Sequence, residues 1–169
     1  MKSAAATPTP VTGQRWQINE GDHLAEDGIV ASLTPGVVDD AAVAAFTNGW
    51  CWALAAQIER ATSWPMVVLG ASNGDWLHAG CRRNDGQIID IEGIWSARQW
   101  QYRWEVSHQG WLANLGCAPG LEVRTPEPAE RELMGWYCGS VETEALAVAA
   151  LFIDPVVSGA GYAGWEIAA

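Results

Sequence analysis

The sequence predicts an α+β domain in which a helix carrying Cys51 packs on an antiparallel β-sheet. Three observations favour this class. The segment that starts at Cys51 repeats apolar residues with helical spacing. Short apolar or alternating runs, which are typical of strands, follow this segment. A glycine-containing turn joins two of these runs directly, and such a short connection makes neighbouring strands antiparallel.

Length and composition set the number of domains. The chain has 169 residues, of which 49% are hydrophobic and 17% charged, so it can bury one core but is short for two ordinary domains. Residues 1–15 are rich in Ala, Thr and Pro and cannot bury enough surface to offset the entropy of ordering. We therefore expect a disordered N-terminal arm over residues 1–15 and a single globular domain over residues 16–169.

The charge balance argues against nucleic acid as a direct ligand. Nine Lys and Arg residues against 20 Asp and Glu residues give a formal net charge of −11, which repels phosphate backbones and favours basic surfaces. The longest apolar run, ALAVAALFI, is far shorter than a membrane span, and the N-terminus lacks the apolar region of a signal peptide. We therefore expect a cytoplasmic protein without membrane contact, with free cysteines rather than disulfides.

The segment around Cys51 has the pattern of an amphipathic helix that starts near residues 48–50 and ends before Pro65. Apolar side chains recur three, four and seven residues after Cys51, while Glu59 and Arg60 lie off this stripe. Cys51 then lies in the first turn, where unpaired N–H groups and the helix dipole favour a thiolate and could hold an oxyanion. The alternative is a purely structural role, because free cysteine is among the most buried residue types.

Three short strands are expected after this helix. The first is an apolar run, the second alternates with Trp76 and His78 on one face, and the third is an isoleucine-rich run that contains Asp90. Together they form the sheet on which the helix packs. They are predicted to span residues 66–71, 76–83 and 87–92.

The loop between the second and third strands decides which side chains meet. The sequence NDG at residues 84–86 suits a three-residue hairpin loop with glycine in the left-handed region. This register places Gly80 opposite Asp90 and makes His78 and Asp90 diagonal neighbours on one face, about 7 Å apart at the backbone. A two-residue loop would shift the pairing by one residue and turn Asp90 to the other face. We favour the first register because of the order Asn-Asp-Gly.

Asp90 lies among isoleucines, where a carboxylate without a partner is costly. A carboxylate in such a place caps a turn or holds a histidine or arginine, and strand geometry makes His78 the nearest candidate. Glu92 is the rival carboxylate. His108 is an alternative base, although it lies in a turn-like segment with no carboxylate placed across from it. The competing interpretation is that His78 has only a structural role on a half-buried strand.

Tryptophan is concentrated in the middle of the chain, with eight of the eleven residues between positions 50 and 111. Large aromatic side chains usually build a core, so packing is the simplest interpretation. The functional alternative is a hydrophobic substrate cleft beside Cys51, walled by Trp50, Trp52, Trp76 and Asn48.

The remaining third of the chain predicts further elements around the sheet. Ser96 and Gln99 form a capping-box pattern at the start of a helix that carries Trp100 and Trp104 one turn apart. Proline and acidic residues in the segment TPEPAEREL suit another helix N-terminus. A last apolar run is expected to be a buried helix or strand that ends at Pro155.

The segment from about residue 48 to residue 93 resembles a known catalytic arrangement. Cys51 opens a helix in NGWCWALA, His78 lies on a following strand in WLHAG, and Asp90 lies on the next strand in DGQIIDIEG. This order is similar to the Cys-His-Asp layout of the transglutaminase-like and arylamine N-acetyltransferase branches of the papain-like superfamily, although only 27 residues separate the cysteine from the histidine. The resemblance implies a compact papain-like fold in which Cys51 is the nucleophile, His78 its base and Asp90 the group that orients the imidazole.

Two functions from different classes remain. The one we favour is a small cysteine-dependent hydrolase or acyltransferase, in which a thioester on Cys51 is resolved by water or by another acceptor. Such an enzyme needs no cofactor and no metal, and its substrate is a peptide, amide or other acyl compound. The alternative is a non-catalytic acidic binding protein, such as an inhibitor, that docks on a basic protein surface through carboxylates and tryptophans.

Overall fold

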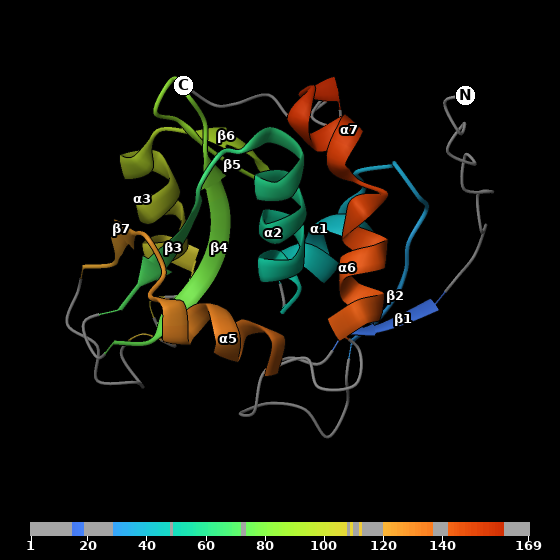
Figure 1. Ribbon diagram of the computed structural model, residues 1–169, viewed down its shortest axis with the longest axis horizontal. Helices are drawn as coiled ribbons and strands as arrows, with labels where there is room; N and C mark the ends of the chain where they lie inside the picture. Colours follow the sequence, from blue (N-terminus) through green and yellow to red (C-terminus); the bar gives the residue numbers. More distant parts are fainter. Residues whose placement is uncertain are drawn as a thin grey trace, which may run out of the picture.

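An antiparallel sheet of five strands forms the centre of the fold (Figure 1). The computed structural model describes residues 15–18, 29–47, 49–71, 74–107, 109, 112, 120–136 and 142–160. The strand order is β6-β5-β4-β3-β7, and neighbouring strands run antiparallel. The strands are β3 (Met66–Gly70), β4 (Trp76–Arg82), β5 (Ile88–Asp90), β6 (Gly93–Trp95) and β7 (Glu122–Arg124).

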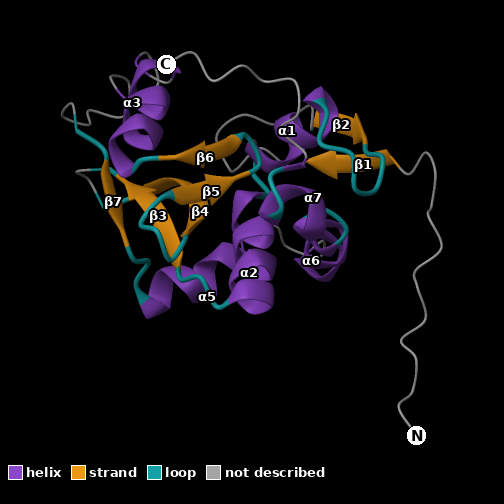
Figure 2. Ribbon diagram, turned by 90° about the horizontal axis from the view of Figure 1, so that it is seen from above, coloured by secondary structure: helices purple, strands orange, loops and turns teal. Residues whose placement is uncertain are grey.

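Helices cover both faces of this sheet. Helix α3 (Ala97–Ser107) lies on one face, whereas α2 (Cys51–Thr62) and α5 (Pro128–Trp136) lie on the other (Figure 2). Within the sheet, α2 makes its most extensive contacts with β4. The predicted α+β class, with the Cys51 helix packed on an antiparallel sheet, is therefore confirmed.

A second layer of helices covers the far side of α2. Helices α1 (Asp40–Thr47), α6 (Glu142–Ala150) and α7 (Ile153–Val157) all contact α2, so this helix lies between them and the sheet (Figure 1). A separate antiparallel pair, β1 (Arg15–Ile18) and β2 (Ile29–Ser32), adjoins α1. The sequence did not predict this pair.

Helix α2 begins at Cys51, just after the start expected near residues 48–50. Its last residue is Thr62, and Ser63 then adopts a left-handed conformation with φ of 62°. The Ser63 N–H donates to the Glu59 carbonyl at 2.8 Å, and Pro65 follows. Cys51 therefore occupies the first turn, where the backbone N–H groups of a helix have no partner within the helix.

The β4–β5 hairpin has the register that the Asn-Asp-Gly loop predicts. Cys81 pairs with Ile89, and the Arg83 N–H closes the loop by donating to the Gln87 carbonyl at 2.8 Å. Gly86 takes φ of 83°, the left-handed conformation that glycine adopts most easily. The alternative two-residue loop is therefore wrong.

The strand predicted over residues 87–92 is shorter than expected, because the chain turns after Asp90. The Asp90 Oδ1 atom accepts hydrogen bonds from the backbone N–H groups of Glu92 and Gly93, at 2.9 and 3.1 Å. An aspartate that bonds the backbone two and three residues ahead stabilises a turn. Gly93 has φ of 150° and pairs with Asp90 as the first residue of β6.

The C-terminal apolar run is helical but does not end at Pro155. Helix α6 stops at Ala150, and Pro155 lies in the first turn of α7. A helix tolerates proline there, because its missing N–H would have had no partner within the helix. Among the described helices, none combines the length and the apolar character that a membrane crossing requires.

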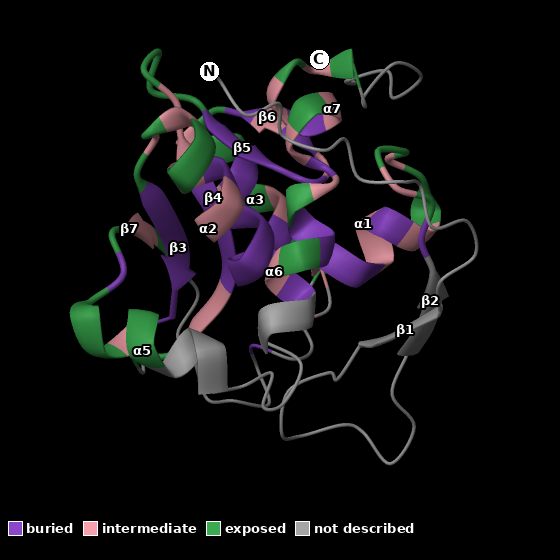
Figure 3. Ribbon diagram, turned by 45° about the vertical axis from the view of Figure 1, so that its right-hand side comes forward, coloured by how far each residue is buried: buried purple, intermediate pink, exposed green. Residues whose placement is uncertain are grey.

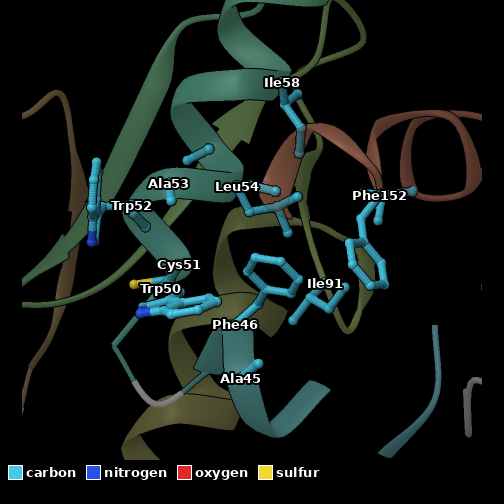
Figure 4. Packing of buried hydrophobic residues seen from close by; sticks show 14 of the residues in the cluster. Ala45, Phe46, Trp50, Cys51, Trp52, Ala53, Leu54, Ile58, Ile91 and Phe152 are labelled. Atoms are coloured by element: carbon cyan, nitrogen blue, oxygen red, sulfur yellow. The ribbon is translucent and has the colours of Figure 1, made fainter. Parts of the chain in front are cut away.

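Two clusters of buried side chains fill the two faces of the sheet. The α2 cluster, between the sheet and the helices around α2, includes Phe46 and Phe152, whose side chains point toward each other (Figure 4). The α3 cluster, between the sheet and α3, includes Trp95, Trp100 and Trp104. Buried positions concentrate in the strands β3 to β5 and in α2 (Figure 3).

Candidate active site

His78 and Asp90 form a buried pair at the end of the β4–β5 hairpin. His78 Nε2 lies 3.1 Å from Asp90 Oδ2, and the two residues are 0% and 2% exposed. The observed register thus brings both side chains to the α3 face of the sheet. The rival carboxylate, Glu92, instead accepts a hydrogen bond from Arg103 Nη2 at 2.6 Å.

The Asp90 carboxylate is held by several donors besides the histidine. Its Oδ1 accepts the two backbone N–H groups of the β5–β6 turn and the Trp95 indole N–H at 3.3 Å. Its Oδ2 accepts the Trp100 indole N–H at 2.6 Å, in addition to His78. Hydrogen bonds of this number and kind offset the cost of burying a carboxylate.

The pair shifts the pKa of both groups. Burial works to raise the pKa of Asp90, but hydrogen bonding and charge from His78, with hydrogen bonds from Trp100 and Glu92, hold it below its ordinary value. Burial works to lower the pKa of His78. The charge of Cys51 and the hydrogen bonds to Asp90 and Cys51 outweigh this effect and raise the pKa of His78 to about 10. At neutral pH the pair is therefore a carboxylate and an imidazolium whose Nε2–H donates to Asp90.

Cys51 is the third member of the group. It is a free cysteine, only 4% exposed, and its sulfur lies at the N-terminal end of α2 (Figure 4). His78 Nδ1 is buried and makes no hydrogen bond of standard geometry within the described part of the chain. The Cys51 side chain is nevertheless close enough to act on the pKa of the ring through both charge and hydrogen bonding. Asp90 binds Nε2, so Nδ1 is the ring nitrogen that has no hydrogen bond of standard geometry to the described residues.

Cys51 belongs to α2, on one face of the sheet, whereas the His78 ring lies on the other face, against tryptophans of α3. The pairing of β5 with β4 covers Cys81 and Arg82 and does not extend to His78. The chain leaves β5 after Asp90, and α2 contacts both β4 and β5. The Cys51 side chain, at the start of α2, acts on the pKa of the imidazole at this end of the sheet.

Tryptophans of α3 enclose the imidazole. The Trp104 ring stacks on His78, with ring centroids 4.2 Å apart and planes inclined by 23°. The Trp100 ring lies 5.6 Å from His78 at a steeper angle of 51°. An aromatic face against an imidazolium is favourable and restricts the plane of the ring.

A groove with a volume of about 420 Å³ adjoins this group. It runs along α3 and the end of α1, and Trp104 belongs both to its wall and to the stack on His78. The two charged side chains in its wall, Glu92 and Arg103, pair with each other. The groove therefore presents no unbalanced charge. Its wall is formed by Thr47, Glu92, Tyr102, Arg103, Trp104, Val106 and Ser107.

Of the residues predicted to wall a substrate cleft, the three tryptophans are not among those that line this groove. Trp50 and Trp52 belong to the α2 cluster and are 1% and 5% exposed, so their placement agrees with the packing alternative. Trp76 is partly buried and packs against the same cluster. Asn48 and the alternative base His108 lie outside the described residues.

Trp95 and Trp100 are the site residues that the sequence reasoning missed. Both were assigned to packing, yet both donate an indole N–H to Asp90. A signal for this role was present, because a buried carboxylate needs donors and tryptophan supplies an uncharged N–H. Two tryptophans within ten residues after such an aspartate are candidates for that purpose.

Among the described residues, no group of three or more His, Cys, Asp and Glu side chains could hold a metal ion.

The binding-protein alternative depends on exposed carboxylates. The acidic stretch NEGDHLAEDG, residues 19–28, lies outside the described residues. In α5, Glu130 accepts two hydrogen bonds from Arg124, at 2.6 and 2.7 Å, so part of the acidic charge of this helix is neutralised within the protein.

Comparisons with known proteins identify no relative. No family model, no curated protein and no solved structure matches this chain. The functional interpretation therefore depends on the geometry of the site.

Proposed function

We propose that this protein is a small cysteine hydrolase or acyltransferase that forms a thioester on Cys51. The observation that carries the proposal is the buried His78 ring, whose Nε2 lies 3.1 Å from Asp90 Oδ2 and whose Nδ1 makes no hydrogen bond of standard geometry with the described residues, while the Cys51 side chain acts on the pKa of the ring. A nucleophile, a base beside it and a carboxylate that orients the base are the parts that nucleophilic catalysis needs. The arrangement also fits a compact member of the papain-like superfamily.

The first half of the reaction acylates the cysteine. An imidazolium next to a thiol favours the thiolate, which attacks the acyl carbon and forms the C–S bond. The backbone N–H of Cys51, in the first turn of α2, is a donor for the oxyanion of the tetrahedral intermediate. The intermediate then expels the leaving amine or alcohol, which takes the proton from His78 Nδ1.

The second half releases the acyl group. His78, now neutral, removes a proton from water or from another acceptor, whose oxygen or nitrogen attacks the thioester carbon. The C–S bond breaks, Cys51 leaves as a thiolate, and His78 is again an imidazolium. Throughout, Asp90 stays ionised and holds Nε2–H, so that Nδ1 is the nitrogen that exchanges the proton.

The surroundings of the site support an uncharged acyl substrate and a reducing compartment. We place the part of the substrate beyond the acyl carbon in the groove beside Trp104, where Glu92 and Arg103 neutralise each other. Cys51 and Cys81 are free thiols, and a nucleophilic thiol persists in the reducing cytoplasm. The net charge of −11 disfavours nucleic acid as a partner.

The test is a comparison of two cysteine variants on an activated substrate such as a thioester or an activated amide. Cys51→Ala should abolish turnover, and mass spectrometry of the quenched wild-type reaction should find the acyl group on the peptide that contains Cys51. Cys81→Ala is the matched control, since Cys81 is also buried but its thiol donates to the Ala55 carbonyl. Turnover that survives Cys51→Ala, or an acyl group found only on another residue, would refute the proposal.

A further inference from the structure

We propose that Trp100 is a positioning residue, which holds the Asp90 carboxylate in the orientation that binds His78. The role rests on the proposed function of Cys51, His78 and Asp90. In this role the Trp100 indole N–H binds Asp90 in addition to packing, and Trp100 does not contact the reacting atoms.

The geometry at Asp90 Oδ2 carries the inference. The Trp100 indole N–H donates to this oxygen at 2.6 Å, and His78 Nε2 binds the same oxygen at 3.1 Å. Trp100 is fully buried, so water does not compete for the bond. Two donors on one oxygen restrict rotation of the carboxylate, and the imidazole follows the carboxylate to which it is bonded.

Local structure fixes the position of the indole from the helix side. The capping box at the start of α3 is formed, with the Ser96 N–H donating to Gln99 Oε1 at 3.0 Å and the Gln99 N–H donating to Ser96 Oγ at 3.3 Å. The Trp100 N–H donates to the Ser96 carbonyl at 3.0 Å. The residue therefore lies in the first turn of a helix whose start is well defined.

Gly80 fixes the position of the indole from the sheet side. A Cβ atom at Gly80 would lie 3.2 Å from Trp100 Cζ2 and 2.8 Å from the Ile89 carbonyl oxygen. The absence of a side chain at this position of β4 lets the Trp100 ring approach the strand closely. The indole is thus confined between α3 and β4 with its N–H at Asp90.

An indole suits this task because it is a neutral donor. It stabilises the carboxylate at every pH, and it adds no positive charge that would compete with the imidazolium for Asp90. The hydrogen bond from Trp100 is among the contacts that lower the pKa of Asp90. Loss of the N–H should therefore make Asp90 easier to protonate and should loosen the imidazole.

Trp95 provides a matched comparison within the same site. Its indole N–H also donates to Asp90, but at 3.3 Å and to Oδ1, the oxygen that already accepts two backbone N–H groups. Trp95→Phe thus leaves the oxygen that binds His78 untouched. Trp100→Phe removes the shorter bond from that oxygen.

The experiment compares Trp100→Phe with Trp95→Phe, and the readouts are the pH profile of turnover and the pH profile of Cys51 alkylation by iodoacetamide. In Trp100→Phe the acidic limb of both profiles should move to higher pH by about one unit, which is the effect of losing one hydrogen bond to a charged group. The kcat value should fall about tenfold while KM stays near the wild-type value. Trp95→Phe should leave the acidic limb within a few tenths of a unit.

An NMR titration of the His78 ring separates this inference from the proposed function. If wild-type Cys51 shows no enhanced reactivity, the enzyme proposal fails, yet a His78 titration altered by Trp100→Phe and not by Trp95→Phe would still support positioning. If Trp100→Phe does not fold, the Trp100 indole N–H resonance of the wild-type protein is measured instead. The chemical shift of that resonance should change as the His78–Asp90 pair titrates. A variant that loses only stability, or an indole resonance that ignores the titration, would overturn the inference.

Discussion

The two faces of the five-stranded sheet bury different kinds of side chain. On the α2 face the buried cluster is apolar, with Phe46, Ile58 and Phe152 among its fully buried members. On the α3 face an ionised pair, His78 and Asp90, is buried among tryptophans. Among the residues that the structure describes, the buried charged side chains, His78 and Asp90, both lie on the α3 face.

Under the proposed function, this difference separates stability from chemistry within one small domain. Apolar burial stabilises a fold by about 25 cal/mol per Å² of surface. A buried ion pair contributes little net stability, because the cost of desolvation offsets most of the attraction, although removal of one partner alone is costly. On this proposal the α2 face stabilises the fold and holds Cys51, whereas the α3 face orients His78. The candidate site combines residues from both faces.

The largest loss of kcat should come from a substitution on the α3 face that removes a charge but keeps the size of the side chain. Asp90→Asn leaves the size of the side chain unchanged but removes the charge that stabilises the imidazolium and fixes its proton on Nε2. We expect kcat to fall by about 10³-fold or more, with circular dichroism and the unfolding midpoint showing that the fold is retained. A fall of less than tenfold would mean that Asp90 is only a turn-capping residue.

The pH dependence of stability should carry the signature of the same pair. The raised pKa of His78 means that its contribution is complete below the ordinary value of 6.5 and is lost as the pH rises toward about 10. The lowered pKa of Asp90 means that its contribution is present above the ordinary value of 3.8 and is lost as the pH falls below it.

Urea denaturation from pH 3 to pH 10 measures this signature. The free energy of unfolding should be highest between about pH 4 and 6.5 and should fall by on the order of 4 kcal/mol toward pH 10, since each pKa unit corresponds to about 1.4 kcal/mol. His78→Gln should flatten the alkaline side. An alkaline side as steep in His78→Gln as in the wild-type protein would assign the effect to other groups.

Truncation of a buried side chain on the α2 face should lower the stability but leave turnover unchanged. Ile58 is fully buried two turns after Cys51, and Ile58→Ala leaves a cavity that should cost about 3 kcal/mol of unfolding free energy. Turnover by the folded fraction should stay near the wild-type rate, because no contact of His78 or Asp90 is removed. Arg60→Ala, an exposed position on the same helix, should change the stability little.

A change in kcat as large in Ile58→Ala as in Asp90→Asn would erase the distinction between the faces. It would show that packing on the α2 face transmits directly to the candidate site. Equilibrium denaturation and steady-state kinetics on the same preparations decide between these outcomes.

Features that depend on local signals were predictable from the sequence. A helix with Cys51 in its first turn follows from the apolar stripe, and the β4–β5 register follows from the Asn-Asp-Gly loop. That register in turn brings His78 and Asp90 to one face, so the pairing of these two residues could be predicted from strand geometry alone.

Features that depend on the turn after Asp90 were not predictable in the same way. Asp90 itself ends β5 by binding the backbone of the turn, and this turn directs Trp95 and Trp100 back toward the carboxylate. The groove beside Trp104 joins the end of α1 to α3, which are far apart in the sequence. Such contacts depend on how the elements pack, and periodicity within one segment does not contain that information.

The most direct test of the central claim, that Cys51 is a nucleophile activated by His78, is the rate of its alkylation as a function of pH. Iodoacetamide modification followed by peptide mapping reports Cys51 and Cys81 in the same sample, and burial raises the pKa of the Cys81 thiol to about 12, so Cys81 is the internal control. We expect Cys51 in the native protein to react well below pH 8 and much faster than Cys81, and His78→Gln to remove this advantage. Equal and slow modification of both cysteines, unchanged by His78→Gln, would contradict the account.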